Sequence, residues 1–209
     1  MQTTTRELPV IFRKYNFKLQ PWQLPKRRTW QLPKWRKHPN KTLFSNDLKF
    51  HIQVQEKSNW CWAAVSQAVS RYILKYKKYE QVTIASKMTG CSCITTCLEN
   101  YPCNKMQLLD KTFRVTGCKY NSIYSCGKIM PAWVLPKIIG RIDMHRPIPC
   151  RIQWVTERTG HFSVIYGYYL ENVNWIFVAD PDSGYSVCNL DEYYSGSSSI
   201  LTNIVILAV

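Results

Sequence analysis

The chain has 209 residues and a mass of 24.6 kDa, which suits one domain with a sizeable core plus an appendage. Hydrophobic residues make up 45% of it, with 8 Trp and 13 Tyr, and this composition excludes a wholly disordered protein. The formal net charge is +15, but residues 1–50 alone hold 12 Lys and Arg against 2 Asp and Glu. The basic character therefore belongs largely to the N-terminal segment.

Residues 1–47 are predicted to form a basic extension rich in proline and tryptophan. They contain five prolines and two copies of the pentapeptide Trp-Gln-Leu-Pro-Lys, which begin at Trp22 and Trp30. Prolines at this density oppose a packed helix or strand. We interpret the segment as a propeptide or targeting extension. An arm that binds an anionic partner, such as a lipid surface, nucleic acid or an acidic protein, is the alternative, and charge alone is weak evidence for it.

The N-terminus does not have the pattern of a secretory signal. The apolar stretch that follows Glu7 contains Pro9 and is too short for the hydrophobic region of a signal peptide. The longest apolar tract, residues 204–209, is too short to span a bilayer. These observations predict a cytoplasmic protein or one exported by a route that needs no cleaved signal.

The chain carries nine cysteines, at positions 61, 91, 93, 97, 103, 118, 126, 150 and 188. If Cys61 is free, the other eight suffice for four disulfides, which would require an oxidising compartment. Reduced thiols are the preferred interpretation because no export signal supports oxidation. The cluster from Cys91 to Cys103 lacks the paired C-x-x-C spacing of zinc sites, so a loop that is reduced or closed by a disulfide is preferred to a metal site.

Helical periodicity begins near residue 60. One apolar stripe follows a spacing of three and four residues, and Lys75, Lys77 and Lys78 lie near its end, where cations suit the helix dipole. The stripe consists of Ala64, Val65, Ala68, Val69, Tyr72, Ile73 and Tyr76. Ser58 and Asn59 are available as caps for this helix.

Three further helices are expected before residue 147. One covers residues 80–88 and ends at Gly90. The next is expected to start with Asn104 as its cap, to carry Met106, Leu109 and Phe113 on one face, and to end at Gly117. The last covers residues 133–141.

The second half of the chain is predicted to form strands. Segments rich in β-branched and aromatic residues are separated by Gly, Asn, Asp and Ser; they are residues 148–154, 162–170, 175–179, 185–188 and 200–209. Helices followed by strands, without alternation, predict an α+β protein with an antiparallel sheet. We expect a domain over residues 48–209 with two lobes, an N-terminal helical lobe and a C-terminal β-sheet lobe, and a cleft between them.

Four residues carry the chemistry of a cysteine hydrolase. Cys61 lies at a helix start, where free backbone N–H groups and the helix dipole favour the thiolate. Gln55, six residues earlier, offers an amide to a developing oxyanion. His161 would serve as general base and Asp180 would orient its imidazole, with Asp182 as a less favoured alternative. Each residue alone has an ordinary structural explanation, but their order and spacing together predict catalysis.

The same motifs resemble those of papain-like cysteine proteases. They are Gln55 six residues before Cys61, Cys-Trp-Ala-Ala from Cys61, Gly-His-Phe from Gly160 and Asp-Pro-x-x-Gly from Asp180. Together they are similar to the bacterial branch that includes the AvrRpt-type effector proteases, over residues 48–209. The resemblance implies a two-lobe papain-like fold, a Cys61–His161–Asp180 triad and an oxyanion hole made by Gln55 and the Cys61 backbone N–H. Papain itself has Asn as the third member.

The predicted function is hydrolysis of peptide bonds in a peptide or protein substrate through a thioester intermediate, without a cofactor or metal. Self-processing is part of this hypothesis, with basic stretches such as Lys26-Arg27-Arg28 as candidate cleavage regions. Two alternatives stay open. The same site would serve a peptide ligase or transpeptidase, and a papain-like scaffold with an unused cleft would serve as a binding module that acts through its basic arm.

Overall fold

The computed structural model describes residues 44–75, 79–93, 102–156 and 159–208. The chain divides into two compact units, Met1–Pro39 and Asn40–Val209, and the description that follows concerns the second. The predictions for residues 1–43, which include both copies of the Trp-Gln-Leu-Pro-Lys repeat, lie outside the described residues. The same holds for Cys97.

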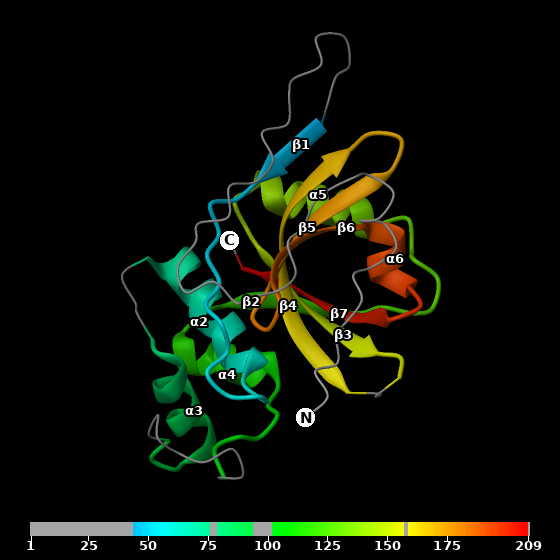
Figure 1. The fold of residues 1–209 in the computed structure, drawn as a ribbon. Coiled ribbons are helices and arrows are strands. Elements are labelled where there is room, and N and C mark those ends of the chain that lie inside the picture. The colour runs from blue at the N-terminus through cyan, green and yellow to red at the C-terminus, as the bar shows by residue number, and fades with distance from the viewer. Residues whose placement is uncertain (1–43, 76–78, 94–101, 157–158, 209) are drawn as a thin grey trace, which may run out of the picture. The chain divides into compact units, whose positions relative to one another are not determined.

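Three helices pack together on one side of the sheet (Figure 1): α2 (Cys61–Leu74), α3 (Gln81–Thr89) and α4 (Leu109–Thr116). The first ten residues of α2 are all buried, because this helix contacts α3, α4 and strand β4 at once. Helices α3 and α4 end at Gly90 and Gly117, which adopt φ values of 70° and 78°. Glycine takes this left-handed conformation without the steric cost of a Cβ atom, so both helices end where the sequence predicted.

The caps predicted for the helix N-termini were wrong. Trp60 is the N-cap of α2 and no side chain caps that helix, so neither Ser58 nor Asn59 does so. Asn104 does not start a helix; its side chain accepts a hydrogen bond from the Asn59 backbone N–H at 3.0 Å. Helix α4 begins only at Leu109, and residues 105–108 form an irregular segment instead of a first helical turn.

The second half of the chain builds an antiparallel sheet of seven strands, so the predicted α+β class is confirmed. The strands are β1 (Phe44–Asp47), β2 (Tyr120–Ser125), β3 (Ile148–Trp154), β4 (Gly160–Leu170), β5 (Asn174–Asp180), β6 (Gly184–Asn189) and β7 (Ser199–Leu207). Their order is β2-β7-β3-β4-β5-β6, and β1 pairs with the far end of β4. Two further helices, α5 (Val134–Asp143) and α6 (Leu190–Ser195), pack against strands of the sheet. The sequence analysis missed β1, β2 and α6.

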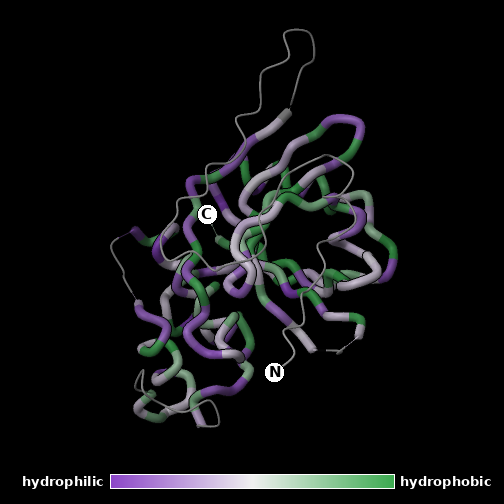
Figure 2. Tube along the Cα trace, viewed as in Figure 1, coloured by the Kyte–Doolittle hydropathy of each residue, from purple (hydrophilic) through white to green (hydrophobic). Residues whose placement is uncertain are grey.

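One hydrophobic core extends from the helices into the sheet. Figure 2 shows hydrophobic residues along the central strands, whereas the turn between β4 and β5 is hydrophilic. In strand β4, eight consecutive residues from His161 to Tyr168 are buried, because this strand lies inside the sheet and also contacts α2. Among the described helices, none combines the length and the apolar character that crossing a bilayer would require.

The described residues fit neither eight reduced thiols nor four disulfides. Cys93 and Cys103 form a disulfide, so the prediction of reduced thiols was wrong for this pair, whereas the alternative of a disulfide that closes the loop from Cys91 to Cys103 is confirmed. Six other cysteines are free, which also excludes four disulfides; they are Cys61, Cys91, Cys118, Cys126, Cys150 and Cys188. In the described part of the chain, no three His, Cys, Asp or Glu side chains gather as a metal ion would require.

Candidate active site

Cys61 is the first residue of α2, and two tryptophans hold this helix start in place. Trp60 and Trp62 are fully buried. Their indole N–H groups donate hydrogen bonds to the carbonyls of Cys103, at 2.8 Å, and Lys105, at 2.9 Å. A buried indole needs such a partner, so each tryptophan fixes both its own ring and the loop that it contacts. The nucleophile candidate therefore stands on a rigid element.

Antiparallel pairing brings His161 and Asp180 to the same end of the sheet. His161 lies at the start of β4 and Asp180 at the end of the neighbouring strand β5. Val164 pairs with Ala179, which places Asp180 opposite residue 163 and diagonal to His161 on the same face. Their side chains meet there, with His161 Nε2 lying 2.9 Å from Asp180 Oδ1 and 3.0 Å from Oδ2.

The Asp180 carboxylate is also held by the turn that follows it. Its Oδ1 accepts hydrogen bonds from the backbone N–H groups of Asp182, at 2.7 Å, and Ser183, at 3.1 Å. Asp182 was the alternative third member, and the structure places its backbone N–H, rather than its carboxylate, in this network. The aspartate next to the imidazole is Asp180.

The environment of His161 favours its protonated form. Burial lowers the pKa of His161, but its hydrogen bonds to Asp180 and Cys61 and the negative charges of both groups outweigh that effect and raise the pKa to about 10. Because Nε2 bonds Asp180, the other ring nitrogen, Nδ1, is the one available to Cys61. At neutral pH the site thus holds an imidazolium between a sulfur atom and a carboxylate.

Trp154 packs against the His161 ring. Its ring centroid lies 6.1 Å from that of His161, with the planes tilted by 32°. Trp154 follows Gln153, which pairs with Gly160 at the start of β4. An aromatic ring against the imidazole reduces the access of water to that ring, and lower exposure to water strengthens the hydrogen bonds that the ring makes. The sequence analysis did not assign this role, because it depends on the register between β3 and β4.

Gln55 makes two hydrogen bonds, one to a residue near Cys61 and one to the residue after Asp180. Its side-chain Nε2 donates to the carbonyl of Ser58, three residues before Cys61, at 2.8 Å. Its backbone N–H donates to the carbonyl of Pro181, directly after Asp180, at 2.9 Å. The loop that carries the predicted oxyanion donor thus bridges the start of α2 and the end of β5.

Gln81 secures this loop from helix α3, and the sequence analysis did not single it out. The Gln81 side chain is only 1% exposed. It donates through Nε2 to the carbonyl of Val54 at 2.8 Å and accepts at Oε1 from the backbone N–H of Glu56 at 3.0 Å. The two bonds lie on either side of Gln55. In the sequence Gln81 looks like an ordinary polar residue at a helix start, and its partners lie more than twenty residues away.

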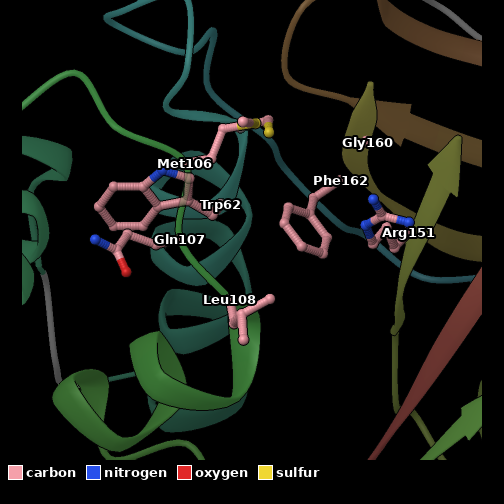
Figure 3. A pocket seen from close by; sticks show the side chains of 8 residues that line it. Trp62, Met106, Gln107, Leu108, Arg151, Gly160 and Phe162 are labelled. Atoms are coloured by element: carbon pink, nitrogen blue, oxygen red, sulfur yellow. The ribbon is translucent and has the colours of Figure 1, made fainter. Parts of the chain in front are cut away.

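A pocket of about 260 Å³ opens beside the nucleophile candidate (Figure 3). Residues from α2 and from the segment before α4 form one side of it, and residues from β3 and β4 form the other. The lining residues are Cys61, Trp62, Met106, Gln107, Leu108, Arg151, Gly160 and Phe162. Met106, which was predicted to lie on a helix face, is 70% exposed at this pocket.

Comparison with known proteins found one family and a related structure. Residues 42–197 match the model of the family described as papain-like cysteine protease AvrRpt2. Among solved structures, the chain is similar to xylellain, a cysteine protease from Xylella fastidiosa, with 11% identity and a TM-score of 0.44. That similarity covers 79% of this chain and 86% of xylellain. A search among curated proteins found no match.

The family match spans well over half of the chain and includes Gln55, Cys61, His161 and Asp180. The chain belongs to the AvrRpt2 family of papain-like cysteine proteases.

Proposed function

We propose that Cys61, His161 and Asp180 act as a catalytic triad that hydrolyses peptide bonds. The observation that carries the proposal is the position of the His161 imidazole, hydrogen-bonded to Asp180 through Nε2 and to Cys61 on its other side. A thiolate paired with an imidazolium is the reactive form of a cysteine nucleophile. Asp180 orients the ring, because a carboxylate on Nε2 leaves Nδ1 facing the sulfur.

In the first step, the Cys61 thiolate attacks the carbonyl carbon of the scissile bond, and the carbonyl oxygen becomes an oxyanion. The Cys61 backbone N–H belongs to the first turn of α2, where N–H groups have no partner within the helix. We assign this group and the Gln55 amide as the oxyanion donors. Support for Gln55 comes from its two anchoring hydrogen bonds, at Ser58 and Pro181.

The His161 imidazolium then gives its Nδ1 proton to the leaving amine, the C–N bond breaks, and a thioester on Cys61 remains. In the second half of the cycle, neutral His161 takes a proton from water, whose oxygen attacks the thioester carbon. The C–S bond breaks, the carboxylic acid product leaves, and the thiolate–imidazolium pair is restored.

Digestion of a peptide library tests this proposal. The full-length protein is incubated with a library of proteome-derived peptides, and new termini are identified by mass spectrometry. We expect cleavage by the wild type and none by Cys61→Ala or His161→Ala. Product masses separate hydrolysis from transfer of the acyl group to an amine, which is the ligase alternative. Unchanged turnover in Cys61→Ala would contradict the proposal.

The N-terminal extension is the substrate that we propose for self-processing. Strand β1 begins at Phe44, and the compact unit begins at Asn40, so cleavage before these residues would leave the sheet whole. Intact mass after storage checks the proposal, with shortening expected in the wild type and absent in Cys61→Ala. A wild-type mass that stays unchanged would contradict self-processing.

A further inference from the structure

We propose that the pocket beside Cys61 binds an acidic side chain of the peptide substrate, and that Arg151 pairs with its carboxylate. The inference rests on the proposed peptidase function and names the residue that would set its specificity.

The pocket is placed to select a residue close to the scissile bond. It includes Cys61 itself and also Gly160 and Phe162, which precede and follow His161 in strand β4. An extended peptide advances about 3.3 Å per residue. A side chain that fills this pocket therefore belongs to a residue within one or two positions of the bond that Cys61 attacks.

Arg151 has no carboxylate partner among the residues that the structure describes. Its Nη1 donates to the neutral hydroxyl of Thr202 at 2.9 Å, and that hydroxyl donates in turn to the Arg151 carbonyl at 3.0 Å. Within the described part of the chain, no carboxylate lies at ion-pair distance from Arg151. A half-buried guanidinium without a counter-ion favours an anionic ligand, and its planar fork suits a carboxylate.

Gly160 makes room for this guanidinium at the pocket. A Cβ atom at residue 160 would lie 2.6 Å from both Cζ and Nε of Arg151, which is far inside van der Waals contact. The Arg151 side chain thus lies across the backbone of β4, one residue away from His161. Figure 3 shows Arg151 beside Gly160 and Phe162, on the sheet side of the pocket.

The other pocket walls suit the aliphatic part of a glutamate. Leu108 and Phe162 line opposite sides of the pocket, and Leu108 is 56% exposed although it is apolar. A glutamate would cover this surface with its two methylene groups and place its carboxylate toward Arg151. A lysine or arginine in the same position would meet the like charge of Arg151.

Peptides that differ only in charge test the inference. The best-cleaved library sequence is resynthesised with Glu, Gln or Lys at each position within two residues of the scissile bond. All peptides are acetylated and amidated, so that the carboxylate of a chain end plays no part. At one position we expect kcat/KM to be about 10- to 100-fold higher for Glu than for Gln, as for a hydrogen bond to a charged group.

Two variants assign the preference to Arg151. Arg151→Met is expected to bring the Glu/Gln ratio close to one while it still cleaves the Gln peptide. Arg151→Lys, which keeps the charge, is expected to keep part of the preference. Arg114→Met is the matched control, because Arg114 is exposed on α4 and does not line the pocket.

Two outcomes would overturn the inference: a wild type that cleaves Glu and Gln peptides equally at every position, or an Arg151→Met variant that keeps the preference. Either differs from failure of the peptidase function itself, in which no peptide would be cleaved at all.

Discussion

His161 uses its two ring nitrogens for two different partners. Nε2 lies within 3.0 Å of both Asp180 carboxylate oxygens, and the ring is also hydrogen-bonded to Cys61. The Asp180 carboxylate is itself fixed by two backbone N–H groups of the following turn. The tautomer and orientation of the imidazole are therefore set by a group that cannot easily move.

The first prediction concerns the two aspartates of this turn. Asp180→Asn should lower kcat/KM by at least about 100-fold, because an amide cannot stabilise the imidazolium and can hold the wrong tautomer. Asp182→Asn is the matched control and should change kcat/KM by less than about threefold, since it contributes through its backbone. Steady-state kinetics on one peptide measures both. A larger loss in Asp182→Asn than in Asp180→Asn would contradict the assignment.

The second prediction is an alkaline limit to activity set by His161. The active form needs the imidazolium, whose pKa is raised to about 10, so kcat/KM should fall only as pH approaches 10. Because the folded-state pKa lies above that of a free histidine, the stabilisation is complete below about pH 6.5 and is lost as pH rises through 10. In Asp180→Asn the alkaline limit should move toward neutrality. A wild-type limit near pH 7 would contradict this account.

The four candidate residues could be found from the sequence because each belongs to a local motif. Cys61 lies at a recognisable helix start, and Asp180 lies in a turn marked by Pro181 and Gly184. Trp154 and Arg151 could not be found in this way. Their roles depend on which residues face them across β3 and β4, and a shift of one residue in register would turn each side chain to the other face of the sheet.

At the scale of elements, the site depends on the loop around Gln55, which is held by hydrogen bonds rather than by hydrophobic packing. Val54 is 66% exposed, so the loop around Gln55 gains little from hydrophobic burial. Hydrogen bonds hold it instead, from Gln81 on α3 and from the backbone of Pro181 after β5. The position of Gln55 therefore depends on helix α3 as well as on its own loop.

The third prediction tests Gln81 as a positioning residue. Gln81→Met keeps the side-chain volume but removes both hydrogen bonds, so kcat should fall by about 10- to 100-fold while KM changes little. Gln81→Glu keeps the acceptor for the Glu56 N–H and should lose less. Steady-state kinetics separates kcat from KM.

The control for this experiment is Gln67→Met. Gln67 is equally buried, on α2, but its amide donates to Glu80 instead of to the Gln55 loop. Both variants should lose stability in thermal melts, and only Gln81→Met should lose kcat. Equal effects on kcat would mean that Gln81 acts through stability alone.

The sequence analysis missed β1 and β2 because neither strand has a run of strand-forming or buried residues. Strand β1 has four residues, and its Asn46 and Asp47 are poor strand formers. Strand β2 has the sequence Tyr-Asn-Ser-Ile-Tyr-Ser and alternates between half-buried and exposed positions, without a fully buried residue. Both depend on pairing with β4 and β7, which are distant in the chain. The strands with continuous buried runs, such as β4, were predictable.

At the scale of the whole unit from Asn40 to Val209, one hydrophobic core joins the helices to the sheet. Cys61 comes from helix α2 and His161 from strand β4. The Cys93–Cys103 disulfide supports this arrangement. The Cys103 carbonyl accepts the hydrogen bond from the Trp60 indole N–H. Residues 106–108, which line the pocket, follow three residues later. The covalent link therefore reinforces the helix start and one wall of the pocket together.

The fourth prediction concerns the stability that this disulfide provides. Its cysteines are 10 residues apart, and closing a loop of that length contributes about 3 kcal/mol in the chain-entropy model. Replacing both with serine should lower Tm by about 6–12 °C. Replacing the free Cys91 with serine is the control and should leave Tm nearly unchanged. A double variant with the wild-type Tm would show that the bond does not stabilise the fold.

The most direct test of the account is the intact mass of the full-length protein after reaction with an epoxysuccinyl thiol-protease probe. We predict one adduct on the wild type, none on Cys61→Ala, and strongly slowed labelling of His161→Ala, because an activated thiolate requires both residues. The other five free cysteines in the described residues should not react. Labelling of Cys61→Ala at the wild-type rate, or no adduct on the wild type, would contradict Cys61 as the nucleophile.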